Sequence, residues 1–308
     1  MIVATAPTRL DFGGGWTDVP PFPEERGGFV CNIAVDRLAT VTLQKGAHVD
    51  VSPLVRAALD RSGVHGVRVD LQSDFPVGAG LGGSSAAGVA LAAALARCQG
   101  RTDAPDVLAA WSRSMEVEQL GIAGGSQDHY AAAFGGALGL SFGAVTTVER
   151  IPLSDRLCKR LEGQCLLAYS GESRISGTTI AAVLDAYRDR VPRVVDALER
   201  MRDLAMHMRD ALLRESVDDL AGLVDEHWAL QRTLHPLITT PRIDAIEQAA
   251  RDAGARGVKA LGASGGGCVI VFVDDDANER VARALAPFAT LLSWRVARRG
   301  VHVQESNT

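Results

Sequence analysis

Residues Phe75–Ala96 read FPVGAGLGGSSAAGVALAAALA and join a glycine-rich loop to a long apolar run. The run Ala86–Ala96 has the composition of a packed helix, and its eleven residues are too few to span a bilayer. In the loop Gly78–Gly83, glycines allow positive φ angles and let the backbone approach a ligand closely. Ser84 and Ser85 stand where we expect the helix N-cap, and N–H groups at a helix start attract anions. The segment therefore predicts a phosphate-binding loop in front of a buried helix.

The same loop matches the pattern G-x-G-x-x-G, but its surroundings do not fit a dinucleotide site. The preceding segment, Val67–Ser73, alternates apolar and polar residues, whereas a strand buried on both faces is uniformly apolar. The stretch after the helix is polar, so no second buried strand ending in an acidic residue follows. The loop also lacks the lysine of a P-loop. These differences argue against both of those nucleotide-binding folds.

Two other glycine clusters occur far from this loop in the sequence. Gly13–Gly15 lies between Asp11 and Asp18, and Gly262–Gly267 lies between two strand-like segments. A tight hairpin needs only about two turn residues, so the longer run of small residues at 262–267 has another purpose. We expect the three glycine segments to line one ligand cleft with backbone.

The overall composition limits the class of protein. The chain has 308 residues, of which 47% are hydrophobic and 22% are charged, with a net charge of −5, as in soluble globular enzymes. This balance lacks the basic face that nucleic-acid binding or anionic membranes require. Five cysteines without a C-x-x-C pair favour a reducing compartment over disulfides or zinc. With no recognisable signal peptide, we predict a cytoplasmic monomer or homodimer that binds a small molecule.

The order of the predicted elements indicates an α+β fold. Strands dominate the first third of the chain, where Asp36-Arg37 is predicted to separate two strands of a hairpin. Helical periodicity takes over between Thr178 and Gln231, and strands return near the chain's end. We predict two closely joined parts, residues 1–165 and 166–308.

Three motifs together resemble the ordered motifs of the GHMP kinases. They are APTRLDFGGGWTD at Ala6–Asp18, PVGAGLGGSSAA at Pro76–Ala87 and LGASGGGCVIVF at Leu261–Phe272. The resemblance implies an N-terminal part similar to ribosomal protein S5 domain 2 and a ferredoxin-like C-terminal part with added helices. It also implies ATP as phosphoryl donor and Mg²⁺ as cofactor.

Within that superfamily, the form of the motifs resembles the sugar kinases acting on heptose 7-phosphates, with the kinase part of fucokinase as a close relative. The stretch GIAGGSQDHYAAAFGG at Gly121–Gly136 is similar to their pattern, except that Ser126 replaces a lysine and His129 a glutamine. The loss of that lysine leaves the identity of the sugar more open than the chemistry.

The resemblance also implies roles for single residues. Asp128 would be the catalytic base, and Arg9 would lie beside the transferred phosphate. Mg²⁺ would be bound by Ser84 and by Glu116, because Glu118 points to another side of its helix. The ATP-binding residues implied are Gly78, Gly80, Leu81, Gly82, Gly83, Ser84, Ser85, Gly265 and Gly266.

On the acceptor side, the resemblance implies Asp18 as a sugar ligand, and Arg174 is a candidate for an acceptor phosphate. Further residues of the substrate wall would be Gly14, Gly15, Trp16 and Thr17. The predicted reaction is phosphorylation of the anomeric hydroxyl of a heptose 7-phosphate to a 1,7-bisphosphate.

Other readings stay open at this point. The acceptor is alternatively another sugar or sugar phosphate, such as a fucose-like hexose or an octose of antibiotic biosynthesis. A mevalonate-pathway enzyme is disfavoured by the form GGGWTD. A catalytically lapsed sensor with the same fold is disfavoured because Arg9, Ser84, Glu116 and Asp128 are all present.

Overall fold

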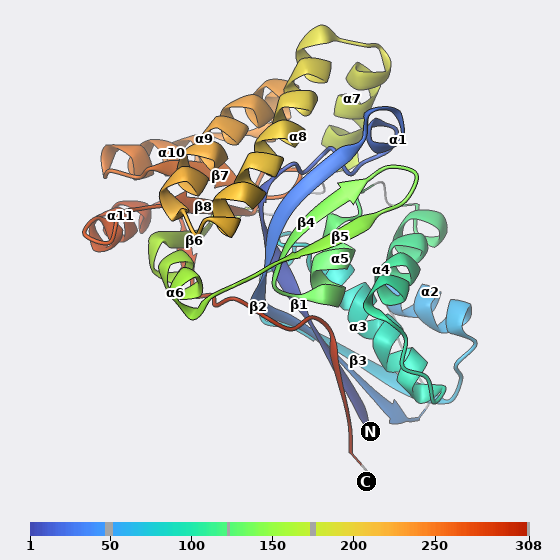
Figure 1. Cartoon of the computed structure of the whole chain (residues 1–308). Coiled ribbons are helices and arrows are strands. Elements are labelled where there is room, and N and C mark those ends of the chain that lie inside the picture. Colours follow the sequence, from blue (N-terminus) through green and yellow to red (C-terminus); the bar gives the residue numbers. More distant parts are fainter. Residues whose placement is uncertain (47–51, 122–123, 173–176, 307–308) are drawn as a thin grey trace.

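Two antiparallel sheets form the framework of the chain (Figure 1). The computed structural model describes residues 1–46, 52–121, 124–172 and 177–306. The first sheet has six strands in the order β10-β1-β2-β4-β5, with β3 also paired to β2. Its strands are β1 (Ile2–Gly13), β2 (Gly28–Lys45), β3 (Val67–Ser73), β4 (Ala137–Phe142), β5 (Thr147–Ile151) and β10 (His302–Glu305).

The hairpin predicted at Asp36-Arg37 is wrong, because β2 runs through this point as one strand of 18 residues. In the pairing with β1, Pro7 lies opposite Leu38 and Thr8 opposite Val35, so the two intervening residues bulge out of the ladder. The bulged residues bond to the chain's end instead: Asp36 accepts from the N–H of Arg295 at 2.7 Å. The polar pair therefore marks a bulge and a tertiary contact rather than a turn.

Several helices pack on the first sheet and bury apolar residues there. The alanine-rich helix α3 (Gly83–Cys98) lies on β1 and β2 beside α5 (Gln127–Phe134), and twelve of its residues are buried. The expected serine N-cap is wrong, since Gly82 with φ 76° occupies that position and no side chain caps the helix. The other helices of this part are α1 (Phe22–Arg26), α2 (Pro53–Ser62), α4 (Pro105–Ser114), the π-helical turn η1 (Met115–Gln119) and α6 (Asp155–Gln164).

The second sheet has a ferredoxin-like arrangement. Its strands β6 (Cys165–Tyr169), β7 (Gly257–Ala260), β8 (Cys268–Phe272) and β9 (Thr290–Leu292) lie in the order β7-β8-β6-β9. Numbered by themselves, these strands follow the order 2-3-1-4 in an antiparallel sheet, as in a βαββαβ unit. The helices of this part are α7 (Gly177–Arg188), α8 (Pro192–Leu213), α9 (Val217–Leu234), α10 (Pro241–Asp252) and α11 (Asn278–Leu285), with the 3₁₀ turn η2 (Pro236–Ile238).

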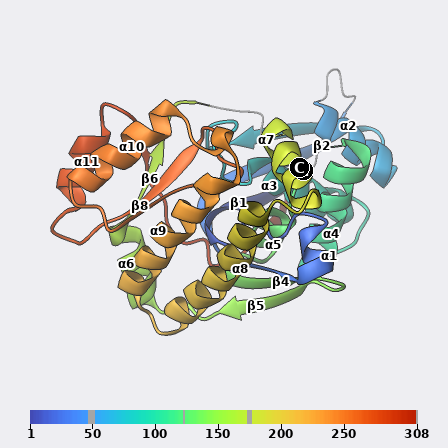
Figure 2. The ribbon, with the colours of Figure 1, turned by 90° about the horizontal axis from the view of Figure 1, so that it is seen from above.

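The two sheets share a core instead of forming separate bodies. Helices α8 and α9 lie side by side (Figure 2), and α8 also packs on β1 and β2 of the first sheet. The predicted division at 165/166 falls at the start of β6, while the last strand, β10, returns to pair with β1. None of the described helices combines the length and apolarity needed to cross a membrane.

A buried ion pair connects the two sheets. Lys259 on β7 donates from Nζ to the Asp11 carboxylate at 3.0 Å and to the Asp11 carbonyl at 2.8 Å, and both side chains are fully enclosed. Burial alone would raise the pKa of Asp11, but the charges of Lys259 and Arg9 outweigh it and lower that pKa. The carboxylate on β1 therefore stays ionised because a residue of the other sheet compensates it.

We predict that Lys259→Met destabilises the protein by about 3–5 kcal/mol, because it leaves a buried carboxylate without its countercharge. Urea unfolding at neutral pH measures this loss. The double variant Asp11→Asn/Lys259→Met removes both charges and should recover a large part of it, since the two residues are directly coupled. Additive losses in the double variant would contradict the coupling.

Candidate active site

A cavity of about 200 Å³ is lined by Gly15 and Gly262, which belong to two of the glycine segments, and by Ser84 and Ser85, which follow the third segment. No residue of Gly78–Gly83 belongs to this lining, so for that loop the expectation of one shared cleft stays a prediction. The lining residues are Arg9, Asp11, Gly15, Trp16, Asp18, Val19, Ser84, Ser85, Glu116, Gly124, Gly125, Gln127, Asp128, Ile180, Gly262 and Ala263.

Arg9 and Asp128 form an ion pair in the cavity wall. The Nε of Arg9 donates to Oδ1 of Asp128 at 2.7 Å, and the arginine side chain is 3% exposed whereas the carboxylate is 24% exposed. Asp128 is the second residue of α5, and its side chain lies against the backbone of Gly82. The buried guanidinium thus orients a carboxylate that remains open to the cavity.

The same arginine is attached to the phosphate loop. Its Nη1 donates to the carbonyl of Gly80 at 2.6 Å, and its backbone N–H donates to Leu81. Gly80 and Gly82 have φ angles of 73° and 76°, a region that residues with a side chain rarely adopt. The loop carbonyls thereby point toward Arg9, and the N–H groups of Gly80, Leu81 and Gly82 donate to no acceptor among the described residues. Such a row of N–H groups before α3 is suited to an anion.

The second and third glycine motifs touch each other. The N–H of Cys268 donates to Ala79 at 2.8 Å, and a Cβ on Gly80 would lie 3.0 Å from the carbonyl of Leu261. In the third motif, Gly262 and Ala263 line the cavity.

Ser84 and Glu116 lie together at the start of α3. The Ser84 hydroxyl donates to Glu116 at 2.7 Å, and the Ser85 hydroxyl donates to its other oxygen at 3.2 Å. Burial would raise the pKa of Glu116, but hydrogen bonds from His129 and the two serines lower it below its ordinary value. Glu118, by contrast, bonds to Ser114 at the exposed side of the same turn.

One ionised carboxylate with a serine hydroxyl is a donor set that fits Mg²⁺, which keeps waters and phosphate oxygens as its other ligands. Within the described ranges there is no cluster of three or more acidic, histidine or cysteine side chains that could hold a metal by protein ligands alone. The residues present therefore suit a cation that arrives with a nucleotide rather than a closed protein cage.

Asp18 caps the helix that carries Asp128. Its Oδ2 accepts from the N–H groups of Ser126 at 2.7 Å and Gln127 at 2.9 Å, and the residue is 3% exposed. Burial raises the pKa of Asp18 to about 6, with smaller increases from the charges of Asp128 and Asp11. Asp18 lines the cavity, and one of its oxygens is already used to fix α5.

The opposite wall holds polar atoms without partners. Oδ1 of Asp11 and Nε1 of Trp16 are buried and make no hydrogen bond with a described residue. A Cβ on Gly15 would come within 2.5 Å of the Asp11 carboxylate. Because unpaired buried polar groups are costly, this wall is suited to a ligand with several hydroxyl groups.

Some predicted ligands lie elsewhere. Gly14 donates to Nε2 of His227, and the Thr17 hydroxyl bonds to the backbone of Gly14 and Phe29, so both stand behind the cavity wall. Gly265 donates its N–H to Ile238, and a Cβ on Gly266 would approach the Glu172 carbonyl at 3.0 Å. These four residues shape the site through the backbone. Arg174 lies outside the described residues.

The sequence analysis missed Lys259 and gave no role to His227, which is fully buried with its pKa lowered to about 3 by burial. Its Nε2 accepts from Gly14, so the ring is neutral and holds the glycine turn in place. A charged residue in the apolar strand VKAL was the available signal for Lys259.

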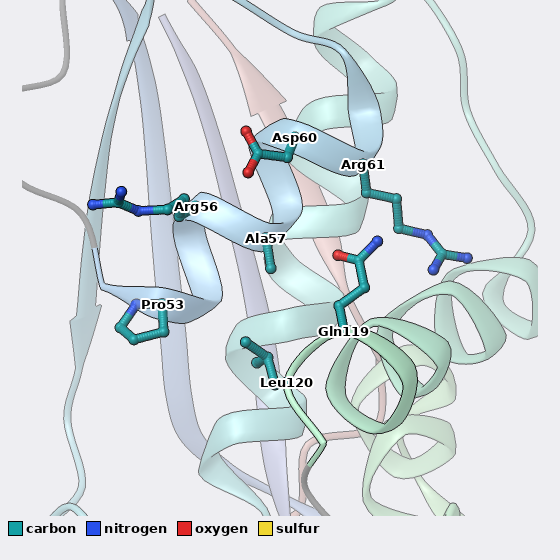
Figure 3. Close-up of a pocket in the computed structure, with 7 residues that line it drawn as sticks. All are labelled: Pro53, Arg56, Ala57, Asp60, Arg61, Gln119 and Leu120. Atoms are coloured by element: carbon teal, nitrogen blue, oxygen red, sulfur yellow. The ribbon is translucent and has the colours of Figure 1, made fainter.

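A separate surface hollow lies between α2 and the residues that follow Glu116 (Figure 3). Its lining residues are Pro53, Arg56, Ala57, Asp60, Arg61, Gln119 and Leu120. It contains none of the predicted site residues, so we assign the chemistry to the smaller cavity.

We predict that Asp18→Asn changes how stability depends on pH. Between pH 3.8 and about 6 the folded protein retains a proton that the unfolded chain has lost, so wild-type stability falls as pH rises through this window. The stability of the asparagine variant relative to wild type should therefore increase by about 2 kcal/mol between pH 4 and pH 7. Urea unfolding at several pH values measures this, with the exposed Asp60→Asn as control. If the stabilities of the variant and of wild type changed with pH in parallel, this would contradict the raised pKa of Asp18.

Comparison with known proteins agrees with this architecture. Residues 50–136 match the GHMP kinases N terminal domain, and residues 208–289 match the GHMP kinases C terminal domain. A D-glycero-D-manno-heptose 1-phosphate kinase from Bacteroides thetaiotaomicron superposes with a TM-score of 0.81 at 21% identity, covering 100% of both chains.

Relatives found by sequence differ in how much of their own length this chain spans. The bifunctional fucokinase/GDP-fucose pyrophosphorylase of Arabidopsis thaliana is 25% identical over 87% of this chain, which spans only 29% of that protein. The D-glycero-alpha-D-manno-heptose 7-phosphate kinase of Campylobacter jejuni is 25% identical, with 91% of each chain covered. Mevalonate kinases match at similar identity. With both domain models matched in order and the fold shared along its whole length, the chain belongs to the GHMP kinases.

Proposed function

We propose that this protein is a sugar kinase that transfers the γ-phosphoryl group of ATP to a sugar hydroxyl. The observation that carries the proposal is the position of Arg9, which pairs with Asp128 and also bonds to the carbonyl of Gly80 in the phosphate loop. One side chain thereby joins a proton acceptor to an anion-binding backbone, the two groups that phosphoryl transfer requires.

In the proposed reaction, Asp128 accepts the proton of the acceptor hydroxyl as its oxygen forms a bond to the γ-phosphorus. The bond between that phosphorus and the bridging oxygen breaks, and ADP leaves with the electron pair. Arg9 stabilises the negative charge on the transferred group, and the N–H groups of Gly80–Gly82 bind the phosphates. Ser84 and Glu116 would hold Mg²⁺, which supplies charge neutralisation when bound.

We further propose that the acceptor hydroxyl is the anomeric one of a heptose 7-phosphate, yielding a 1,7-bisphosphate. The partnerless groups of Asp11 and Trp16 support a polyhydroxylated ligand, and the heptose phosphate kinase relative supports this acceptor. Arg174 is our candidate for the 7-phosphate.

A fucose-like hexose, favoured by the fucokinase relative, or an octose is the alternative acceptor. The intact Arg9–Asp128 pair speaks against a catalytically lapsed sensor.

The acceptor is tested by measuring ADP release with Mg·ATP and a panel of acceptors, followed by ³¹P NMR of the product. The panel contains the heptose 7-phosphate, the free heptose, fucose, an octose and mevalonate. We expect the heptose 7-phosphate to have the highest kcat/KM, and Arg174→Ala to raise KM for this acceptor but not for the free heptose. Preference for mevalonate would overturn the sugar kinase proposal, and preference for an unphosphorylated sugar would overturn only the acceptor.

We predict that Asp128→Asn lowers kcat by about 100- to 10,000-fold, because the amide cannot accept the proton of the acceptor hydroxyl. Steady-state kinetics measures the loss, and ADP binding by calorimetry should remain close to wild type. Asp60→Asn, at an exposed site on α2, serves as the control. Turnover of the asparagine variant near the wild-type rate would remove Asp128 from the mechanism.

A further inference from the structure

We propose that His129 is a positioning residue that fixes the Glu116 carboxylate for cation binding. The inference rests on the proposed function, since it concerns the same nucleotide-associated cation. His129 is on α5, one residue after Asp128, and its side chain is buried. It lies under the start of α3 and does not belong to the cavity lining, so it acts only through its neighbours.

Both ring nitrogens of His129 have a partner. Nε2 lies 3.0 Å from Oε2 of Glu116 and 3.4 Å from the Ser85 hydroxyl, and Nδ1 lies 3.0 Å from the Ser112 hydroxyl. An ionised carboxylate only accepts hydrogen bonds, so Nε2 carries a proton, while Nδ1 forms a hydrogen bond with the Ser112 hydroxyl.

The surrounding backbone is built to bring these side chains together. A Cβ on Gly88 of α3 would lie 2.3 Å from the Ser112 hydroxyl, so a side chain there would displace this hydroxyl from its present position. Glu116 itself lies on the π-helical turn η1, closed by the bond from the Leu120 N–H to the Met115 carbonyl at 3.2 Å. Wider turns of this kind inside helices occur often at functional sites. Side chains of α3 and α5 thus contact the carboxylate that η1 carries, and Ser112 of α4 contacts the histidine.

The orientation has a chemical consequence. His129 and Ser85 hold Oε2 from the buried side, so Oε1 is directed to the Ser84 hydroxyl at the cavity. Without the ring, a glutamate on a wide turn has several rotamers available, and the cation would have to select one of them. Groups that orient a ligating carboxylate in this way change metal affinity by about 10- to 100-fold when they are removed.

Two near-isosteric substitutions distinguish the effect of the Nε2 hydrogen bond from the effect of filling the buried space. His129→Gln places an amide N–H where Nε2 stands and keeps the bond to Glu116, whereas His129→Asn keeps only the contact with Ser112. Mn²⁺ affinity is measured by electron paramagnetic resonance on the full-length protein with saturating ADP. We expect about a tenfold loss for the asparagine variant and near-wild-type affinity for the glutamine variant.

Controls show whether the effect is specific to the cation. ADP binding in EDTA should be unchanged in both variants, and Glu118→Gln on the same turn should leave Mn²⁺ affinity unchanged. If His129→Asn does not fold, Ser112→Ala, which removes the hydrogen-bond partner of Nδ1, takes its place with a smaller loss expected. Equal Mn²⁺ affinities in the asparagine, glutamine and wild-type proteins, or equal losses in the two variants, would overturn the proposal. Because the measurement needs no sugar, a wrong acceptor assignment would not affect it.

Discussion

The site depends on one buried guanidinium. Arg9 extends from β1 and binds the carbonyl of Gly80 on one side and Asp128 on the other. A buried arginine must have its donors satisfied, and here the partners are the loop and helix that phosphoryl transfer needs side by side. The loop cannot turn its carbonyls toward Arg9 without positive φ angles, so its glycines and the arginine are parts of one arrangement.

Four carboxylates line a small cavity, and each has a different electrostatic environment. Lys259 neutralises Asp11, Arg9 pairs with Asp128, and Glu116 is held by two serines and a histidine. Asp18 has no cationic partner among the described residues, and burial moves its pKa to about 6. The result is a pocket in which negative charge is either paired or oriented.

Local patterns predicted much of this site. The glycine clusters and the helix after the loop were recognisable from their residue types, whereas the roles of Arg9, Glu116 and Asp128 were implied by the resemblance to the GHMP kinases. The predicted serine N-cap and the hairpin at Asp36-Arg37 were wrong for one reason: short-range propensity competes with tertiary partners. Ser84 and Ser85 bond to Glu116 instead of a helix end, and Asp36 bonds to the chain's last segment.

The sequence by itself determined the family of fold, the order of its motifs and the chemical character of the cleft, since glycine and charge requirements are local. Only the tertiary structure decided the partners. Asp11 and Lys259 are 248 residues apart, and nothing in either segment indicates that they meet. The same holds for His129 beneath Glu116 and for Asp18 at the start of α5. Which buried polar group satisfies which other depends on how sheets and helices pack, because burial is what makes each pairing necessary.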